Sequence, residues 1–461
     1  MSRLGDNASA LESLIAGLDP FQPGLVPPEI AQRARTCVID MLAGAFALPH
    51  DLRPNAARAV VSRGLGASVF GATIETGPAD AAFANAVASA TAETNDTHAP
   101  TATHPGIVVI PAVLAVAEAE GLSGASILAG IVAGYEAMGR LARIVVTPEL
   151  VRTFRSSGVV GPTAAAIGVA RALGLSEAQT VHAAALATHA AGGLNEWSHA
   201  GAGEHVFQIG HAARTGTVAA LLARIGVEGA ASILDGRAGL FAAFGGAERA
   251  GLVVRGPNEP AEICNVVHKP APACFFVQTP AQVAARLAHD HQPDPAAISS
   301  VAIHVAAAAA GFPGCDNPGP MRTRQDASMS LQFSVSSVLV EGRIAHSAWE
   351  AWDHPTVNAL AGRTRLVVDD GFTHAWPARL GARVVLREFG GRTLQASAPD
   401  FASMRGDEVA ERFLATASPV VGPSRAEAAL ELAERLDTLN EVRGLARLLR
   451  PLREEQPNGA A

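Results

Sequence analysis

Alanine-rich segments with apolar residues at helical spacing fill roughly the first 262 residues of this 461-residue chain. Two examples are Ile30–Leu48, which follows a pair of prolines, and Ala79–Ala92. Alanine has the highest intrinsic helix propensity, and its small side chain lets helices approach one another closely. Aromatic residues make up only 5% of the chain, and Tyr135 is its single tyrosine. This pattern predicts a large domain of closely packed helices.

The pattern changes after about residue 265. Val301–Val305 alternates apolar and polar side chains, as a half-buried strand does. Gly390–Gly391 separates two extended segments, Val384–Phe389 and Arg392–Ala396, which is typical of a β-hairpin. Helical spacing returns after Arg405. We therefore predict a mainly α fold with three segments: a helical domain over residues 1–265, an inserted smaller α+β domain over 266–402, and helices over 403–461 that return to the first domain.

Charge and cysteine usage argue against several classes of protein. The net charge is −8 and no basic tract occurs, which argues against a nucleic-acid partner or an anionic membrane surface. Apolar stretches such as Leu122–Val146 contain charged residues and glycines, so they indicate buried helices of a globular protein. The four cysteines form no C-x-x-C motif, which is typical of free thiols in a reducing compartment. We expect a cytoplasmic protein with no membrane and no nucleic-acid partner.

The segment Glu93–Gly106 is a polar island between two apolar segments. It brings Glu93, Asp96, His98 and His104 into fourteen residues. Titratable groups between hydrophobic helices are costly to bury, and histidine beside a carboxylate can both bind anions and transfer protons. The structural alternative is that Asp96 caps a helix and that His104 lies in an ordinary turn. The functional interpretation predicts acid–base chemistry on a small molecule.

Cations further along the chain are candidates for binding a carboxylate. Arg155, followed by Ser156 and Ser157 just before a helical segment, offers a forked cation, hydroxyls and free backbone N–H groups. Lys269 lies between apolar residues and prolines and is a second candidate. The alternative for both is a solvated surface cation. We assign nearby Cys274 to core packing, because no local feature of the sequence lowers the pKa of its thiol.

The glycine-rich loop Asn195–His205 contains two histidines and two glutamates in eleven residues. Their spacing matches no familiar zinc pattern, so we expect no metal at this loop. Gly201–Gly203 lacks the strand-to-helix context of a phosphate-binding loop. The sequence therefore predicts a site that works without a nucleotide cofactor.

Several short motifs follow one another in a fixed order along nearly the whole chain: Ala81-Ala-Phe-Ala-Asn85 before Glu93-x-x-Asp96-Thr97, His104-Pro-Gly, Gly134-Tyr-Glu136 with Arg140, Gly210-x-Ala-Ala-Arg-x-Gly216, Lys269 with Cys274, and Met329-Ser-Leu-Gln-Phe333. In this order they resemble the MmgE/PrpD family, which includes 2-methylcitrate dehydratase, cis-aconitate decarboxylase and iminodisuccinate epimerase. The resemblance implies a large helical domain plus a small α+β domain, with the active site in the cleft between them. It also implies a homodimer that acts on small di- and tricarboxylates without metal or organic cofactor.

The chain departs from the family pattern at several polar positions. The family usually carries aspartates where this chain has Glu93 and Asn95, and often a histidine at the position of Ala90. Three further family residues, a histidine, a lysine and a tyrosine, are replaced respectively by Arg155, His205 and Phe333. His104 and Lys269 match the family.

We assign roles to the candidate residues from their chemistry and from this resemblance. The residues predicted to handle protons are His104, Glu93, Asp96 and His205. The residues predicted to bind the anionic carboxylate substrate are Arg155, Lys269, Asn95, Thr97, His98, Ser156 and Ser157.

Three functions remain open from the sequence. The first is a cofactor-independent lyase, of the dehydratase or decarboxylase type, that acts on a small di- or tricarboxylic acid. The second is an epimerase or isomerase that removes and returns the proton next to a carboxylate, for which His104 and His205 could be the two bases. The third is a non-catalytic relative that binds a small acid.

Overall fold

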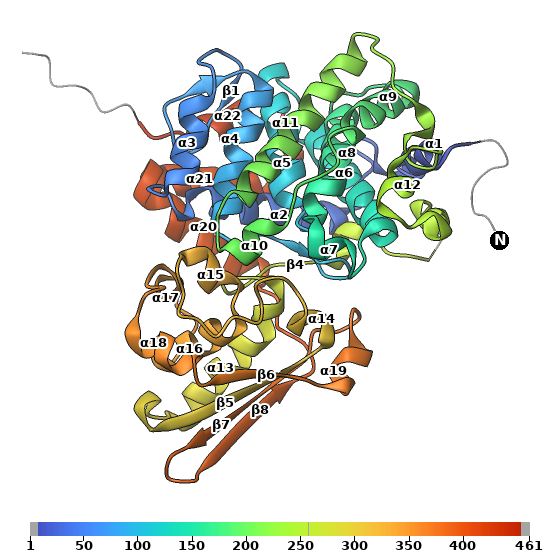
Figure 1. Ribbon diagram of the computed structural model, residues 1–461. Coiled ribbons are helices and arrows are strands. Elements are labelled where there is room, and N and C mark those ends of the chain that lie inside the picture. The colour runs from blue at the N-terminus through green and yellow to red at the C-terminus, as the bar shows by residue number, and fades with distance from the viewer. Residues whose placement is uncertain (1–7, 257, 453–461) are drawn as a thin grey trace, which may run out of the picture.

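The computed structural model describes residues 8–256 and 258–452, and it is mainly helical with a small mixed sheet in the C-terminal region (Figure 1). The predicted fold class is therefore confirmed. The long helices gather in one part of the molecule, and the sheet lies at its other end (Figure 1). None of the helices in the described ranges is long and apolar enough to span a lipid bilayer.

Long helices from the N-terminal half form most of the helical part. They are α2 (Pro28–Ala47), α4 (Pro78–Thr91), α5 (Gly106–Glu120), α6 (Gly124–Val145), α8 (Ser156–Ala172), α9 (Glu177–Thr188) and α11 (His205–Arg224). Shorter helices connect or cover them: α1 (Ala10–Ala16), α3 (Leu52–Val60), α7 (Leu150–Thr153), α10 (Glu196–Ala200) and α12 (Leu240–Phe244). Two strand pairs lie among them: β1 (Ala67–Ser68) with β2 (Glu75–Thr76), and β3 (Thr97–His98) with β4 (Val266–Val267).

Two long helices, α5 and α8, continue through a proline. Helix α5 runs through Pro111, and α8 runs through Pro162. Proline removes one backbone hydrogen bond, so each first turn needs other support. In α5 the carboxylate of Asp96 accepts a hydrogen bond from the Gly106 N–H at 2.9 Å. In α8 the Arg155 carbonyl accepts from the N–H of Gly158 at 2.9 Å.

The C-terminal region contains a four-stranded sheet with the order β6-β5-β7-β8. Its strands are β5 (Ile298–Val305), β6 (Thr364–Val368), β7 (Ala382–Glu388) and β8 (Thr393–Ala398). β5 pairs in parallel with β6 and antiparallel with β7, which pairs antiparallel with β8. The predicted hairpin at Gly390–Gly391 is confirmed, since this glycine pair joins β7 to β8 and Gly391 has a φ of 86°.

Helices of the C-terminal region accompany the sheet and then return to the helical part. The helices beside the sheet are α13 (Gln278–His291), α14 (Ala307–Ala310), α15 (Arg324–Met329), α16 (Leu331–Glu341), α17 (Ser347–Glu350), α18 (Pro355–Ala361) and α19 (Asp370–Ala375). The last helices are α20 (Gly406–Val421), α21 (Pro423–Glu434) and α22 (Arg443–Leu448). The red C-terminal ribbon of these helices lies among the blue N-terminal helices (Figure 1).

Two separate apolar cores correspond to the two parts of the molecule. One core joins residues from the N-terminal helices to Val409, Phe413 and other residues of the last helices. The second core surrounds the sheet and includes Phe276, Phe333 and Trp349. The segment boundaries predicted at residues 265 and 402 remain a proposal.

The crossing of α6 and α8 depends on paired glycines. A Cβ atom on Gly130 would lie 2.6 Å from the Gly168 carbonyl oxygen, and one on Gly168 would lie 2.9 Å from that of Gly130. We expect Gly130→Ala to lower the free energy of unfolding by about 1–3 kcal/mol, because overpacking outweighs the gain of roughly 1 kcal/mol in helix propensity. Denaturant unfolding measures this change. Gly251→Ala is the control, since its added Cβ meets no atom within 4 Å. Equal stability of the two variants would contradict the close crossing.

Candidate active site

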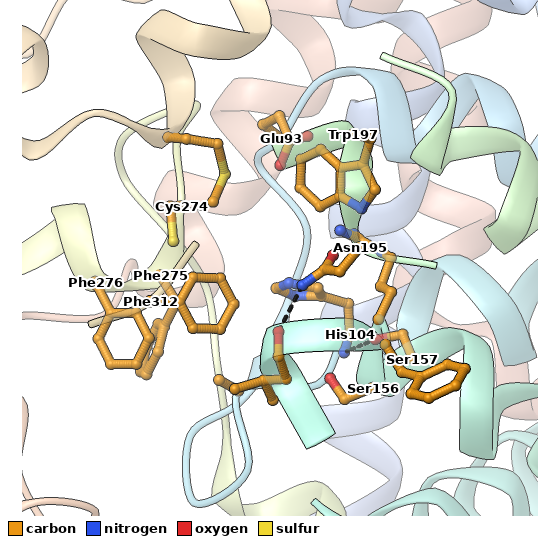
Figure 2. Close-up of a pocket in the computed structure, with 15 residues that line it drawn as sticks. Glu93, His104, Ser156, Ser157, Asn195, Trp197, Cys274, Phe275, Phe276 and Phe312 are labelled. Carbon is orange, nitrogen blue, oxygen red and sulfur yellow. Dashed lines mark hydrogen bonds between the residues drawn. The ribbon is translucent and has the colours of Figure 1, made fainter. Parts of the chain in front are cut away.

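A pocket of about 540 Å³ lies where the helical part meets the sheet-bearing part (Figure 2). Its polar lining comes from the loop after α4, the first turn of α8, the segment at α10 and the turn before α13. These lining residues are Glu93, His104, Arg155, Ser156, Ser157, Asn195 and Cys274. Its apolar lining residues are Ala102, Val151, Phe154, Trp197, Phe275, Phe276, Phe312 and Met329.

Glu93 and His205 form a buried pair at one wall of the pocket. The Nε2 atom of His205 lies 2.8 Å from Oε1 of Glu93, and the histidine ring stacks on Trp197 with ring centroids 4.1 Å apart. Glu93 has a φ of 59°, which is uncommon for a residue other than glycine. Such local strain is often retained at functional sites. His205 lies under Glu93 and does not itself line the pocket.

The charges of this pair follow from burial and from nearby cations. Burial alone would raise the pKa of Glu93, but the hydrogen bond and charge of His205, with the charges of Lys269 and Arg155, hold that pKa well below its ordinary value. Burial, together with the charge of Arg155, lowers the pKa of His205 to about 4. We therefore describe the pair as a neutral imidazole that donates its Nε2 proton to an ionised Glu93 carboxylate.

His104 reaches the pocket from the turn before α5. Its Nδ1 atom lies 3.0 Å from the backbone oxygen of Asp96, so Nδ1 carries the proton and donates it to that carbonyl. The ring therefore keeps a free lone pair at Nε2. Burial lowers the pKa of His104 to about 3, with further lowering by the positive charges of Lys269 and Arg155. His104 is thus neutral at pH 7.

Arg155 is the N-cap residue of α8, and Ser156 and Ser157 form the first turn of that helix. Its guanidinium carbon lies 5.2 Å from the centre of the Trp197 ring, which fixes the cation over an aromatic face. Within the described part of the chain, no carboxylate forms an ion pair with this guanidinium and its Nε atom has no hydrogen-bond partner. The hydroxyl of Ser157 accepts a hydrogen bond from the His104 N–H at 3.0 Å. The helix start thus presents a cation on which the charge of Glu93 acts from a distance, without an ion-pair contact.

Lys269 and Cys274 lie on the opposite side, from the segment before α13. Lys269 is fully buried and donates a hydrogen bond from Nζ to the Ala273 carbonyl at 3.0 Å, and it does not line the pocket. Its charge still acts there, as the lowered pKa of His104 shows. The sulfur of Cys274 lines the pocket and lies 3.7 Å from that of Cys315. The hydrogen bond with Cys315 lowers the pKa of Cys274.

The structure places six of the predicted site residues outside the pocket lining: His205 and Lys269, described above, and Asp96, Thr97, His98 and Asn95. Both carboxylate oxygens of Asp96 are occupied, one by the Gly106 N–H and the other by the Tyr135 hydroxyl at 2.6 Å. Thr97 and His98 form β3, and His98 pairs with Glu262 at 2.8 Å in a different ion-pair network. Asn95 is buried, and both of its side-chain polar atoms lack a partner among the described residues.

A metal-binding arrangement is not found at this pocket. Over residues 8–256 and 258–452, no three His, Cys, Asp or Glu side chains lie close enough together to hold an ion. The expectation that the site works without a metal or organic cofactor stays a prediction.

Two family models match consecutive parts of the chain. The MmgE/PrpD N-terminal domain matches residues 20–252, and the MmgE/PrpD C-terminal domain matches residues 271–438. The chain belongs to the MmgE/PrpD family. The resemblance inferred from the ordered motifs is thereby confirmed.

Curated relatives in this family carry one recurring name. A human protein named cis-aconitate decarboxylase is 31% identical over 245 residues, which are 51% of this chain and 50% of the relative. An Aspergillus terreus protein of the same name is 26% identical over 225 residues, 47% of this chain and 46% of the relative. The chain thus spans about half the length of the curated relatives it matches.

Sequence reasoning missed part of the pocket of this MmgE/PrpD protein. Trp197 and Asn195 were considered only as neighbours of possible metal ligands, yet both line the pocket, and Trp197 stacks on His205. Cys274 was assigned to the core, and it does belong to the second core, but it also lines the pocket. The sequence did contain a signal for this wall. Aromatic residues are scarce in the chain, yet two of them, Phe275 and Phe276, directly follow Cys274.

Two neutral buried histidines make the stability of this MmgE/PrpD protein depend on pH. The lowered pKa values of His205, about 4, and His104, about 3, lie below the ordinary 6.5. Between pH 6.5 and 4 the unfolded chain therefore binds protons that the native protein does not, and the free energy of unfolding falls as pH falls. Denaturant unfolding at a series of pH values measures this slope. We expect His104→Asn to reduce the slope, and the same change at exposed His289 to leave it unaltered. A slope unchanged in His104→Asn would contradict the low pKa.

Proposed function

We propose that the protein is a cofactor-independent lyase that acts on a small di- or tricarboxylic acid in the pocket of Glu93, His104 and Arg155. One observation carries this proposal: within the described chain, no carboxylate lies at ion-pair distance from the Arg155 guanidinium, which is beside Ser156 and Ser157 at the start of α8. Arg155 is half-buried, so its charge is only partly hydrated, and a substrate carboxylate would supply an ion-pair contact. The names of the curated relatives support a decarboxylase as the specific reaction.

The proposed chemistry begins with binding of the anion. One substrate carboxylate pairs with Arg155 and accepts hydrogen bonds from the hydroxyls of the α8 first turn. Its negative charge offsets the positive charges of Arg155 and Lys269 that lower the pKa of His104. His104 then takes up a proton at Nε2, while Nδ1 remains bonded to the Asp96 carbonyl. Binding of the substrate thus converts a neutral imidazole into an acid.

Bond cleavage follows in this bound state. The bond between the substrate and a second carboxylate breaks, carbon dioxide leaves, and the electron pair stays on the substrate carbon. The nearby cations stabilise the charge that develops. The carbon then takes the proton from His104 Nε2. The ionised Glu93, held by His205, stabilises the protonated imidazole and does not need to change its own charge.

A second candidate is an epimerase of a dicarboxylate. It is favoured by one observation, which is that two separate groups able to handle protons, His104 and the Glu93–His205 pair, meet at one pocket. Removal of a proton by one group and its return by the other would invert the carbon next to a carboxylate.

Incubation with cis-aconitate and a panel of dicarboxylates in heavy water separates these functions. A decarboxylase releases carbon dioxide in amounts equal to the substrate lost and gives a product with one deuterium at the carbon that lost it. An epimerase exchanges the proton next to a carboxylate and releases nothing. If neither signal exceeds that of Arg155→Leu across the panel, the lyase proposal is wrong.

A further inference from the structure

Aromatic side chains are concentrated at the proposed active site. Aromatic residues are 5% of the chain, yet five of the fifteen residues that line the pocket are aromatic. Phe275, Phe276 and Phe312 lie together on the side opposite Ser156 and Ser157 (Figure 2). A pocket that held only carboxylates would be expected to present cations and hydrogen-bond donors on all sides. This side presents rings instead.

The apolar wall continues into a second cavity, which is open to solvent. The two cavities share Ala102, Val151, Phe276 and Phe312, so they adjoin. The ring of Phe276 lies 5.2 Å from the rings of both Phe312 and Trp376, which extends the aromatic surface into the second cavity. Its remaining lining is largely aliphatic, from Val146, Ala307 and Ala308 among others. Its one charged lining residue, Arg152, is exposed to solvent.

The cations at the pocket are too few for a tricarboxylate. Arg155 is the only Lys or Arg side chain in the pocket lining. Lys269 acts from behind the wall, with its Nζ bonded to the Ala273 carbonyl. These two charges match two carboxylates. A third carboxylate would lack a cation, and on the side of Phe276 and Phe312 it would lose its hydration without gaining a partner, which is costly.

We propose that the preferred substrate is a dicarboxylic acid carrying an apolar substituent, such as an alkyl chain, in place of a third carboxylate. The carboxylates bind near Arg155 and Lys269, and the substituent lies on Phe276 and Phe312 and extends into the adjoining cavity. This inference rests on the proposed lyase function for the reaction itself. The inference itself concerns which acid the pocket binds, so it can be tested by binding as well as by turnover.

The test uses the 461-residue chain and compares acids with and without an alkyl substituent. The probes are maleate and succinate derivatives with substituents from methyl to hexyl, together with cis-aconitate and citrate. Turnover is measured by carbon dioxide release or deuterium exchange, and binding by quenching of tryptophan fluorescence, since Trp197 and Trp376 line the two cavities. We expect the dissociation constant to fall by about fourfold for each added methylene until the cavity is filled.

Substitutions at Phe312 sharpen the test, because this half-buried residue lines both cavities. Phe312→Ala should weaken binding of the hexyl-substituted acid by about tenfold or more and leave the unsubstituted acid within about twofold. Phe312→Arg should supply the missing cation and shift the preference to cis-aconitate. Phe389→Ala is the matched control, because Phe389 is 72% exposed at the hairpin. Thermal unfolding verifies that each variant is folded.

The outcomes distinguish this inference from the proposed function. Tighter binding of alkyl-substituted acids without turnover of any acid would support the proposed preference for an apolar substituent and overturn the proposed lyase function. Turnover in which cis-aconitate is favoured over every alkyl-substituted acid would support the proposed lyase function and overturn the proposed preference for an apolar substituent. Absence of both binding and turnover across the panel would overturn both.

Discussion

Replacing Arg155 by leucine is expected to lower kcat/KM for the carboxylate substrate by roughly a hundredfold or more, because the substrate anion would then enter a buried site without its charged partner. The loss should arise mainly through KM, since the ion pair forms already in the bound ground state. Steady-state kinetics with the substrate identified in the heavy-water assay measure this change.

The same substitution should not destabilise the protein. Within the described residues the guanidinium of Arg155 forms no ion-pair contact, and burial lowers its pKa by more than the charge of Glu93 raises it, so its removal relieves a desolvation cost larger than the attraction that is lost. We therefore expect a free energy of unfolding at or above that of the wild type. The matched control is Arg214→Gln, which removes an exposed ion pair with Asp80 at 3.0 Å and should change neither activity nor stability. A large loss of stability in Arg155→Leu would instead assign Arg155 to the structure.

Replacing His104 by asparagine is expected to lower kcat by about 10²- to 10⁴-fold, the usual contribution of a positioned acid or base. An asparagine amide can still donate to the Asp96 carbonyl, as Nδ1 of the histidine does at 3.0 Å. It has no group at the Nε2 position that titrates. The variant therefore tests the proton at Nε2 with little change in the turn before α5. Substitution of exposed His289 by asparagine is the control and should leave kcat unchanged.

The pH profile of the wild-type protein shows whether His104 donates or accepts a proton in the reaction. In the free protein the pKa of His104 is lowered to about 3, so the acid form is scarce at neutral pH. If His104 is the acid in the reaction, kcat/KM falls by about tenfold for each unit of rising pH between pH 5 and 8. His104→Asn should remove this dependence. A flat profile in the wild type would mean that the neutral imidazole is the active form, and His104 would then be a base.

Local sequence patterns were sufficient to predict the elements and part of the site. Alanine-rich periodicity indicates α2 and α4 because propensity and packing agree there. The Gly390–Gly391 pair indicates the hairpin because the backbone requires it. Residues that a charge argument singled out, Glu93, His104 and Arg155, do meet at one pocket.

The remaining features depend on contacts that a local pattern does not contain. Asp96 is close in sequence to His104, but its carboxylate is bound by Gly106, ten residues later, and by Tyr135 of α6. The residues around Lys269 in the sequence indicate a cation that lines the pocket. In the structure the turn before α13 directs its Nζ to the Ala273 carbonyl instead. The aromatic wall likewise joins Phe276 to Phe312, and their proximity is set by the tertiary fold.

The return of the last helices to the first has a consequence for how the protein is made. Arg412 of α20 forms an ion pair with Asp40 of α2 and donates a hydrogen bond to the backbone carbonyl of Lys269 at 2.8 Å. The segment carrying Lys269 is therefore held by residues far apart in the chain, and contacts of such separation form late in folding. On the ribosome the pocket stays incomplete until α20 has emerged, so a nascent chain that already contains Glu93, His104 and Arg155 does not yet have the finished site.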